Sequence, residues 1–356
     1  MHKIPAGAVL AAVLAAMLCP NSPPAGGTTR WQKVDVAVNE AGRRVDVAID
    51  GKPFTSYMWP ASLKKPVLYP LRRADGAIVT RGFPLEPRAG ERVDHPHHAG
   101  LWFNYGNVNG FDFWNNSDAI KPEDRPKMGT VIHQSIVMAK GGAERGELET
   151  KEIWQDGAGK TILTQRTQYV FRGSSGSRSV DLIATLEAGD EQAVFHDDKE
   201  GLLGMRVARS LEGAADQPQV FTDASGRPTP VAKANPAEVT GVYLTSEGKK
   251  GDAAWGTRGR WCTLAGSLDG APVTIAILDN PRNPGSPTYW HARAYGLFAA
   301  NPLGAKVFSN GKEEMNFTLA PHANVTFRYR VLILSQAATP QTVETEYEAF
   351  AAEYRR

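Results

Sequence analysis

Hydrophobic and polar residues alternate along most of this chain. Between 33 and 57, valine and isoleucine recur at every second position, and Asp50-Gly51 interrupts the pattern with a pair typical of a hairpin turn. Alternating segments recur at 67–80, 150–171 and 179–188. Strands joined by such turns pair in antiparallel sheets, so the sequence predicts a meander of antiparallel strands.

Two segments, 272–279 and 324–334, are more uniformly apolar than the others. Such strands are typical of a sheet that is covered on both faces. Only 340–354 shows helical periodicity, and Thr339 and Pro340 are suited to cap and start that helix. The apolar stripe of the expected helix consists of Val343, Tyr347, Phe350 and Tyr354.

Many strands without alternating helices favour packed antiparallel sheets. We therefore predict an all-β protein in which residues 28–356 form a single domain. Its expected architecture is one large antiparallel two-sheet sandwich with a single C-terminal helix. The irregular stretch 115–129 is better explained as a loop over a site than as a domain boundary.

Residues 1–27 have the layout of a signal peptide followed by a linker. A short basic start precedes an apolar run over 6–18, which is too short to span a bilayer. We expect an exported protein, periplasmic or extracellular, cleaved near Ala25. Lipidation at Cys19 is disfavoured because a bulky residue precedes it. Without Cys19 the only thiol is Cys262, so no intramolecular disulfide is expected.

Charge is balanced along the chain. Forty basic and thirty-eight acidic residues leave a formal net charge of +2, with no long run of one sign. Nucleic-acid and anionic-membrane partners usually select for clustered basic residues. We therefore expect neither a nucleic-acid partner nor a membrane span in the mature chain, and a small molecule becomes the expected ligand.

The segment DHPHHAG, residues 94–100, concentrates three of the eight histidines. In an extended chain His95 and His97 share a face, whereas His98 points away. Pro96 cannot donate to a ladder, which favours an edge or loop that lines a cleft. Alternating imidazoles suit acid/base chemistry and also metal binding. Further metal ligands would be Asp94, His133 or His291. We predict no cofactor, with a divalent metal ion as the alternative.

Aromatic residues crowd the segment that follows. Phe103, Phe111 and Phe113 are expected in the core, because alternating large residues in a strand usually pack there. Trp102 and Trp114 stand beside carboxamides and a carboxylate. An indole face next to such groups suits a sugar, whose hydroxyls take directional hydrogen bonds. The expected polar partners of the sugar are Asn104, Asn109 and Asp112.

Two further polar segments carry candidate chemistry. In 195–208, Lys199 and Glu200 supply a cation and a carboxylate, and Arg206 follows as a binding residue. In 279–304, a Pro-rich loop leads into a Tyr-Trp-His-x-Arg sequence. His291 can act there as acid or base, Arg293 can stabilise negative charge on oxygen, and Tyr289 can bind substrate.

Four motifs together resemble one bacterial family, domain of unknown function 6807. They cover 94–114, 129–133, 199–208 and 287–304. Members often carry the label methane oxygenase PmoA, which the residues do not support, since a membrane subunit needs apolar spans of about twenty residues. The resemblance implies an exported protein of polysaccharide-degrading bacteria, a sandwich of the galactose-mutarotase type and a carbohydrate substrate.

We therefore expect a secreted enzyme that uses histidine acid/base chemistry on a sugar or an oxidised (keto) sugar glycoside, as a hydrolase, lyase or epimerase. A non-catalytic carbohydrate-binding protein is the first alternative, and a metal-dependent sugar enzyme is the second. The expected catalytic residues are His95, His97, His98, His133, His291, Arg293, Lys199 and Glu200. The expected substrate-binding residues are Trp102, Asn104, Asn109, Asp112, Trp114, Arg206 and Tyr289.

Overall fold

A computed structural model describes residues 1–2, 30–214 and 217–355. The chain separates into a unit of residues 1–30 and a compact unit of residues 31–356. The expected signal peptide and its cleavage site lie outside the described residues. None of the helices in the described residues is long and apolar enough to cross a membrane.

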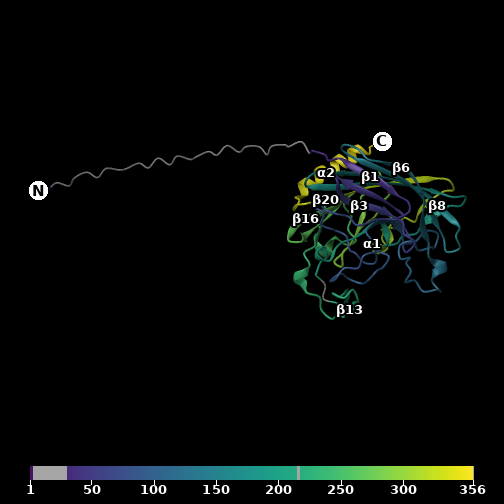
Figure 1. Cartoon of the computed structure of the whole chain (residues 1–356), viewed down its shortest axis with the longest axis horizontal. Coiled ribbons are helices and arrows are strands. Elements are labelled where there is room, and N and C mark those ends of the chain that lie inside the picture. The colour runs from purple at the N-terminus through teal and green to yellow at the C-terminus, as the bar shows by residue number, and fades with distance from the viewer. Residues whose placement is uncertain (3–29, 215–216, 356) are drawn as a thin grey trace. The chain divides into compact units, whose positions relative to one another are not determined.

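Two eight-stranded antiparallel sheets dominate the fold (Figure 1). The first sheet contains, in spatial order, β1 (Val34–Asn39), β2 (Arg44–Ile49), β3 (Lys52–Met58), β4 (Val67–Leu68), β5 (Leu101–Tyr105), β11 (Gly201–Arg206), β18 (Leu297–Asn301) and β17 (Tyr289–Arg293). The second contains β14 (Val242–Thr245), β15 (Trp261–Leu268), β16 (Ala271–Asp279), β20 (Asn324–Leu334), β9 (Ser177–Ala188), β8 (Thr161–Gly173), β7 (Gly146–Gln155) and β6 (Thr130–Lys140). This confirms the predicted all-β, two-sheet architecture.

Smaller elements complete the unit. Two strand pairs stand apart from the main sheets: β10 (Ala193–Phe195) with β19 (Phe317–Leu319), and β12 (Gln219–Thr222) with β13 (Pro228–Val231). Short 3-10 turns are η1 (Arg125–Lys127), η2 (Arg209–Leu211), η3 (Pro236–Glu238) and η4 (Gly251–Ala254). The helices are α1 (Ala305–Phe308) and α2 (Pro340–Glu353). The single turn α1 was not expected from the sequence.

The C-terminal helix α2 forms as its sequence predicts. The side chain of Thr339 accepts a hydrogen bond from the backbone N–H of Thr342, and Pro340 occupies the first turn. Val343, Tyr347 and Phe350 are buried on one stripe. This stripe packs against the outer face of β15, β16 and β20. Figure 1 shows α2 beside β16 and β20. The stripe therefore explains why both faces of β16 and of the C-terminal half of β20 are buried.

The main core lies between the two sheets, where alternate residues of each strand point inward. In β5 the inward residues are Leu101, Phe103 and Tyr105. The ring of Phe103 lies 6.1 Å from that of Phe327 in the second sheet, which places the two inner faces in direct contact. The other residues of β5 must then point to the outer face of the first sheet, and this is the face on which the distant polar motifs meet.

Candidate active site

Strand register brings the sequence motifs together on the outer face of the first sheet. Trp102 of β5 pairs with Gly204 of β11, Gly204 with Ala299 of β18, and Ala299 with His291 of β17. A Cβ on Gly204 would lie 2.6 Å from both the Trp102 and the Trp114 rings, so only glycine permits this approach. The adjacent row contains Arg206, Leu297 and Arg293. Three segments far apart in sequence thus share one surface.

Two buried arginines fix the turn at residues 94–98. Arg81 pairs with the Asp94 carboxylate at 2.5 Å and also donates to the carbonyls of His95 and His98, at 3.0 and 3.1 Å. Arg206 reaches the same carboxylate at 2.8 Å. Burial raises the pKa of Asp94, but the hydrogen bond from His95 and the two guanidinium charges outweigh it and hold that pKa well below its usual range. Asp94 is therefore an ionised anchor for the histidine turn.

Four rings form a layered stack across the site. His95 lies parallel to Tyr295, with ring centroids 5.1 Å apart, and parallel to His98 at 4.9 Å. His98 in turn stacks on Trp102 at 5.1 Å, and His97 meets His98 edge-on at 4.3 Å. We call Asp94, His95, His97, His98, Arg206 and Tyr295 the histidine cluster. The stack orients the two more accessible imidazoles, those of His95 and His97.

His97 and His98 are both held neutral. Burial, followed by the nearby charge of Lys65, lowers the pKa of His97 to about 2. Burial also lowers the pKa of His98 well below its ordinary value, and the Trp114 indole N–H donates to Nε2 of His98 at 3.2 Å. His98 is thus a buried positioning residue. The buried Nε2 of His97, by contrast, has no hydrogen-bond partner among the described residues.

Lys65 belongs to this site, although no sequence motif marks it. Its buried Nζ donates to the Trp114 carbonyl at 3.1 Å and lies 5.2 Å from the centre of the Trp102 ring. Burial lowers the pKa of Lys65 to about 7, against the opposing charges of Asp112 and Glu200. A lysine with such a pKa exchanges protons at neutral pH. Only the fold reveals it, because its loop has no distinctive composition.

Glu200, Lys199 and His291 form a second group at the same face. Lys199 is ion-paired with Oε1 of Glu200, while Oε2 of Glu200 is buried without a hydrogen bond among the described residues. His291 Nδ1 lies 3.0 Å from the Lys199 carbonyl, which can only accept, so the Nε2 lone pair stays free in the neutral ring. Burial, then the charges of Lys199 and Arg293, lowers the pKa of His291 to about 3.

These two groups lie within electrostatic range of each other. His95 contributes to the lowered pKa of His291, and Glu200 contributes to the raised pKa of Tyr295, for which burial is the largest cause. The exposed Arg293 extends over the Tyr295 ring at 5.9 Å. The structure thus gathers His95, His97 and His291 with a cation and a carboxylate. Such a set can take up, hold and return protons.

The expected tryptophan platform is wrong. Trp102 and Trp114 are only 1% and 0% exposed, because Val67, Tyr69 and Ala99 cover them. Neither ring can offer a face to a sugar in this arrangement. The expected core role is confirmed for Phe103 and Phe113, which are buried, whereas Phe111 is only partly buried against the core.

Several predicted binding residues shape loops or the interior instead. Asp112 accepts from the backbone N–H groups of Trp114 and Asn115, both at 2.9 Å, and so closes a turn. Asn109 adopts a positive φ of 53° and bonds to the Gln192 carbonyl. Buried Asn104 donates to the Phe113 carbonyl. These contacts correct the expectation that all three carboxamide or carboxylate groups point at a ligand.

Two further predicted residues also have structural partners. Tyr289 is buried, stacks on Phe308 and donates its hydroxyl to Glu313 at 3.1 Å. Arg206 is fully buried and bonds to Asp94, so it positions the histidine turn. The side chain of Arg206 still has an unpaired Nε among the described residues.

His133 does not join the cluster. It lies on β6 and stacks on Trp59, with ring centroids 4.1 Å apart, in a separate pocket. Within the described residues its ring contacts are Tyr57 and Trp59, and none is a histidine. The expectation of one cleft for all these histidines is corrected at this position. Among the described residues, no group of three or more His, Cys, Asp or Glu side chains is placed to hold a metal ion.

The chain is similar to several solved structures, all at low sequence identity. The galactose 1-epimerase of Lactobacillus acidophilus is 12% identical, with a TM-score of 0.35, and the match covers 87% of this chain and 100% of the epimerase. The galactosidase domain of an α-galactosidase-sucrose kinase is 10% identical, with a TM-score of 0.39, and the match covers 85% of this chain and 42% of that protein.

The α-galactosidase of Lactobacillus brevis is also similar, at 10% identity and a TM-score of 0.33, covering 87% of this chain and 39% of that protein. No curated protein matches the chain by sequence. The sequence model of a family of unknown function, DUF6807, matches residues 44–348, and the chain therefore belongs to this family.

Proposed function

We propose that this chain is an exported carbohydrate-active enzyme that moves a proton on a sugar or an oxidised sugar at the histidine cluster. The observation that carries the proposal is the state of His97. Its imidazole is neutral, and its buried Nε2 has no hydrogen-bond partner among the described residues. A neutral imidazole with a free nitrogen is the usual form of a general base.

The groups around His97 supply the remaining parts of such a reaction. Lys65, when protonated, places a positive charge beside the site and can stabilise negative charge that develops on a substrate oxygen. Glu200 carries a carboxylate oxygen without a hydrogen bond among the described residues, and burial raises its pKa, so it can return a proton. His291, fixed in one tautomer by the Lys199 carbonyl, is a second acceptor.

A hydroxyl-rich ligand suits the unmet hydrogen bonds of this face. Among the described residues, an unpaired donor occurs at Arg206 Nε, and unpaired acceptors occur at His97 Nε2 and Glu200 Oε2. A hydroxyl group both donates and accepts, so sugar hydroxyls match a surface of mixed donors and acceptors better than a carboxylate or an ammonium group does. This supports carbohydrate as the substrate class.

The test is an activity screen of the purified protein on glycosides and their 3-keto derivatives, with and without chelator. We expect turnover of at least one substrate that survives chelator and is lost in His97→Asn. The matched control is His322→Asn, because His322 is exposed and lies on the loop before β20. If the unaltered protein binds sugar but turns over no substrate, it is a non-catalytic carbohydrate-binding protein and the enzyme proposal is wrong. Loss of turnover in chelator would favour the metal-dependent one.

A further inference from the structure

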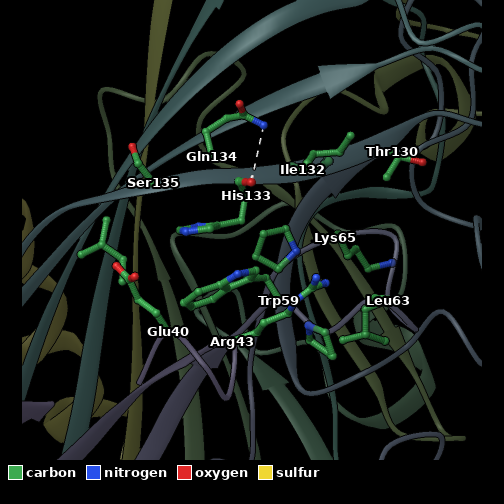
Figure 2. Close-up of a pocket in the computed structure, with 15 residues that line it drawn as sticks. Glu40, Arg43, Trp59, Leu63, Lys65, Thr130, Ile132, His133, Gln134 and Ser135 are labelled. Carbon is green, nitrogen blue, oxygen red and sulfur yellow. Dashed lines mark hydrogen bonds between the residues drawn. The ribbon is translucent and has the colours of Figure 1, made fainter. Parts of the chain in front are cut away.

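A cavity of about 570 Å³ lies along the edge strand β6. That volume is within the range of about 300–1,000 Å³ that small-molecule sites occupy. His133, Gln134 and Ser135 of β6 line one side, and Trp59 and Arg43 lie across from them (Figure 2). We call this cavity the His133 pocket. Half-buried His133 presents its ring there, stacked on Trp59.

A chain of buried polar groups stands behind His133. The Tyr57 hydroxyl lies 3.0 Å from Nδ1 of His133 and 2.9 Å from Oε1 of Glu152. Both Tyr57 and Glu152 are buried, and Tyr57 belongs to the first sheet whereas Glu152 belongs to the second. Thr150 and Thr167 also bond to the Glu152 carboxylate, at 2.5 and 3.1 Å. The chain thus crosses the sandwich and ends at the pocket.

The direction of these hydrogen bonds is fixed at the far end. The Trp154 indole can only donate, so the Gln165 carbonyl accepts from it at 2.7 Å. The Gln165 amide therefore donates to the Thr167 hydroxyl at 2.7 Å, and Thr167 donates to Glu152. Three hydroxyl groups then point at Glu152, which is the arrangement expected for an ionised carboxylate.

The hydrogen bonds of Tyr57 set the tautomer of His133. Because the Tyr57 proton points at Glu152, the Tyr57 oxygen accepts from Nδ1–H of His133. The neutral ring then carries its lone pair on Nε2, the nitrogen that is not engaged by Tyr57. Packing alone does not require these polar groups. A phenylalanine in place of Tyr57 and an aliphatic residue in place of Glu152 would fill the same space without removing polar groups from water.

We propose that the His133 pocket is a second ligand site, in which Nε2 of His133 takes a proton from a hydroxyl group of a bound sugar unit or similar polyol. The ligand O–H bond breaks as Nε2–H forms. The Nδ1 proton moves to the Tyr57 oxygen, and the Tyr57 proton moves to Glu152. One proton therefore passes from the ligand to Glu152, which becomes neutral. The ligand oxygen keeps the electron pair of the broken O–H bond and carries the negative charge, and His133 ends neutral in its other tautomer.

Charge placement supports delivery of the proton to Glu152. Burial lowers the pKa of His133 to about 4, so an imidazolium ion is disfavoured. Burial also raises the pKa of Glu152 to about 7, against the hydrogen bonds from Thr150, Tyr57 and Thr167, so Glu152 is the better proton store. The other titratable groups that line the pocket or adjoin the relay are Glu40, Arg43, Lys65 and Tyr169. Aromatic Trp59 beside polar groups suits a sugar ring.

The relay of His133, Tyr57 and Glu152 contains none of the residues of the histidine cluster, so its test does not depend on turnover there. Nitrogen-detected NMR of His133 should show the neutral Nδ1–H tautomer in the unaltered protein. Tyr57→Phe and Glu152→Gln should both reduce that preference. The matched control is Tyr169→Phe, which removes a buried hydroxyl from the adjoining ring, 5.6 Å from Tyr57, and leaves the contacts of Tyr57 with His133 and Glu152 in place. A Nε2–H tautomer, or no change in both relay variants, would overturn the proposal.

Ligand binding is tested with D-glucose, D-galactose and D-glucuronate, followed through the indole N–H signal of Trp59. We expect at least one probe to shift this signal, and Tyr57→Phe to weaken that binding by about tenfold, roughly one hydrogen bond to a polar partner. Preference for glucuronate would assign a role to Arg43, and preference for a neutral sugar would assign recognition to hydroxyl groups. Even a weak site should bind one of these probes at concentrations up to about 50 mM. If none of the three shifts the Trp59 indole signal up to that concentration, the ligand site is overturned.

Discussion

The two outer faces of the sandwich each bury a cluster of charges, and the clusters differ in how completely their hydrogen bonds are met. Under α2, Asp181 of β9 is fully buried and accepts from Arg330 at 2.5 and 2.8 Å, from Arg172 at 2.6 Å and from Tyr354 at 2.9 Å. Arg330 also reaches Glu353 at 2.8 Å. We call these five residues the Asp181 cluster.

The histidine cluster on the other outer face is buried to a similar degree but is incompletely paired. Polar atoms of His97, Arg206 and the adjoining Glu200 lack partners among the described residues, whereas the same criterion finds none in the Asp181 cluster. Buried polar groups are nearly always paired in folded proteins. Burial of charge is thus common to both clusters, and unmet hydrogen bonds distinguish the histidine cluster from the Asp181 cluster.

The largest expected effect follows from the paired cluster. Asp181→Asn removes the charge that two buried guanidinium groups share, and breaking a buried ion pair costs about 3–5 kcal/mol. We expect the free energy of unfolding in urea to fall by that amount. Asp190→Asn is the control. Asp190 is fully exposed, so this substitution should change the free energy of unfolding too little to measure. Equal stability of the two variants would contradict a structural role for the Asp181 cluster.

The reverse pattern is expected at the histidine cluster. His97→Asn should reduce turnover by about 10² or more, the usual size of a general acid/base contribution. Its stability should be nearly unchanged, because Nε2 of His97 has no bond to lose among the described residues. Kinetics and urea unfolding on the same preparations separate the two effects. A variant that loses stability and keeps its turnover per folded molecule would show that the cluster is structural.

Much of the fold follows from local sequence. Alternation fixes which residues of β5 share a face, and the cap at Thr339 fixes the start of α2. The site was predicted in part, because motifs rich in His, Pro and Gly did converge from β5, β11 and β17. Strand pairing accounts for this, since neighbouring strands carry their conspicuous residues to one surface.

What the sequence could not supply was long-range cover and pairing. Trp102 points outward as alternation requires, but loop residues such as Tyr69 and Ala99 bury it. Lys65 acquires an unusual pKa only through that burial. His133 was grouped with the other histidines by composition, yet its partner Tyr57 lies 76 positions away in another sheet. Periodicity carries no information about such contacts.

Lys65 should make the free energy of unfolding depend on pH. Its folded pKa of about 7 is below the ordinary value of 10.5, so between these values the unfolded chain binds a proton that the folded chain does not. Stability therefore rises with pH in this window, by about 1.4 kcal/mol per unit. Relative to Lys65→Met, the unaltered protein should gain about 2 kcal/mol between pH 7 and pH 9. Lys33→Met, at an exposed position, is the control. If the stability difference between the unaltered protein and Lys65→Met stays the same from pH 7 to pH 9, the lowered pKa of Lys65 is contradicted.

The smallest effect is expected at the rim of the site. Lys199 pairs with Glu200 but is 49% exposed, so Lys199→Met should change stability by less than about 1 kcal/mol. Its influence should instead appear in titration. Burial raises the pKa of Glu200 and the hydrogen bond from Lys199 lowers it, so removing Lys199 should raise that pKa further. Carbon-detected NMR of the Glu200 carboxylate measures this directly. An unchanged or lower pKa of Glu200 would mean that the Lys199–Glu200 ion pair does not form in solution. The charge of Lys199 would then not offset the burial of Glu200.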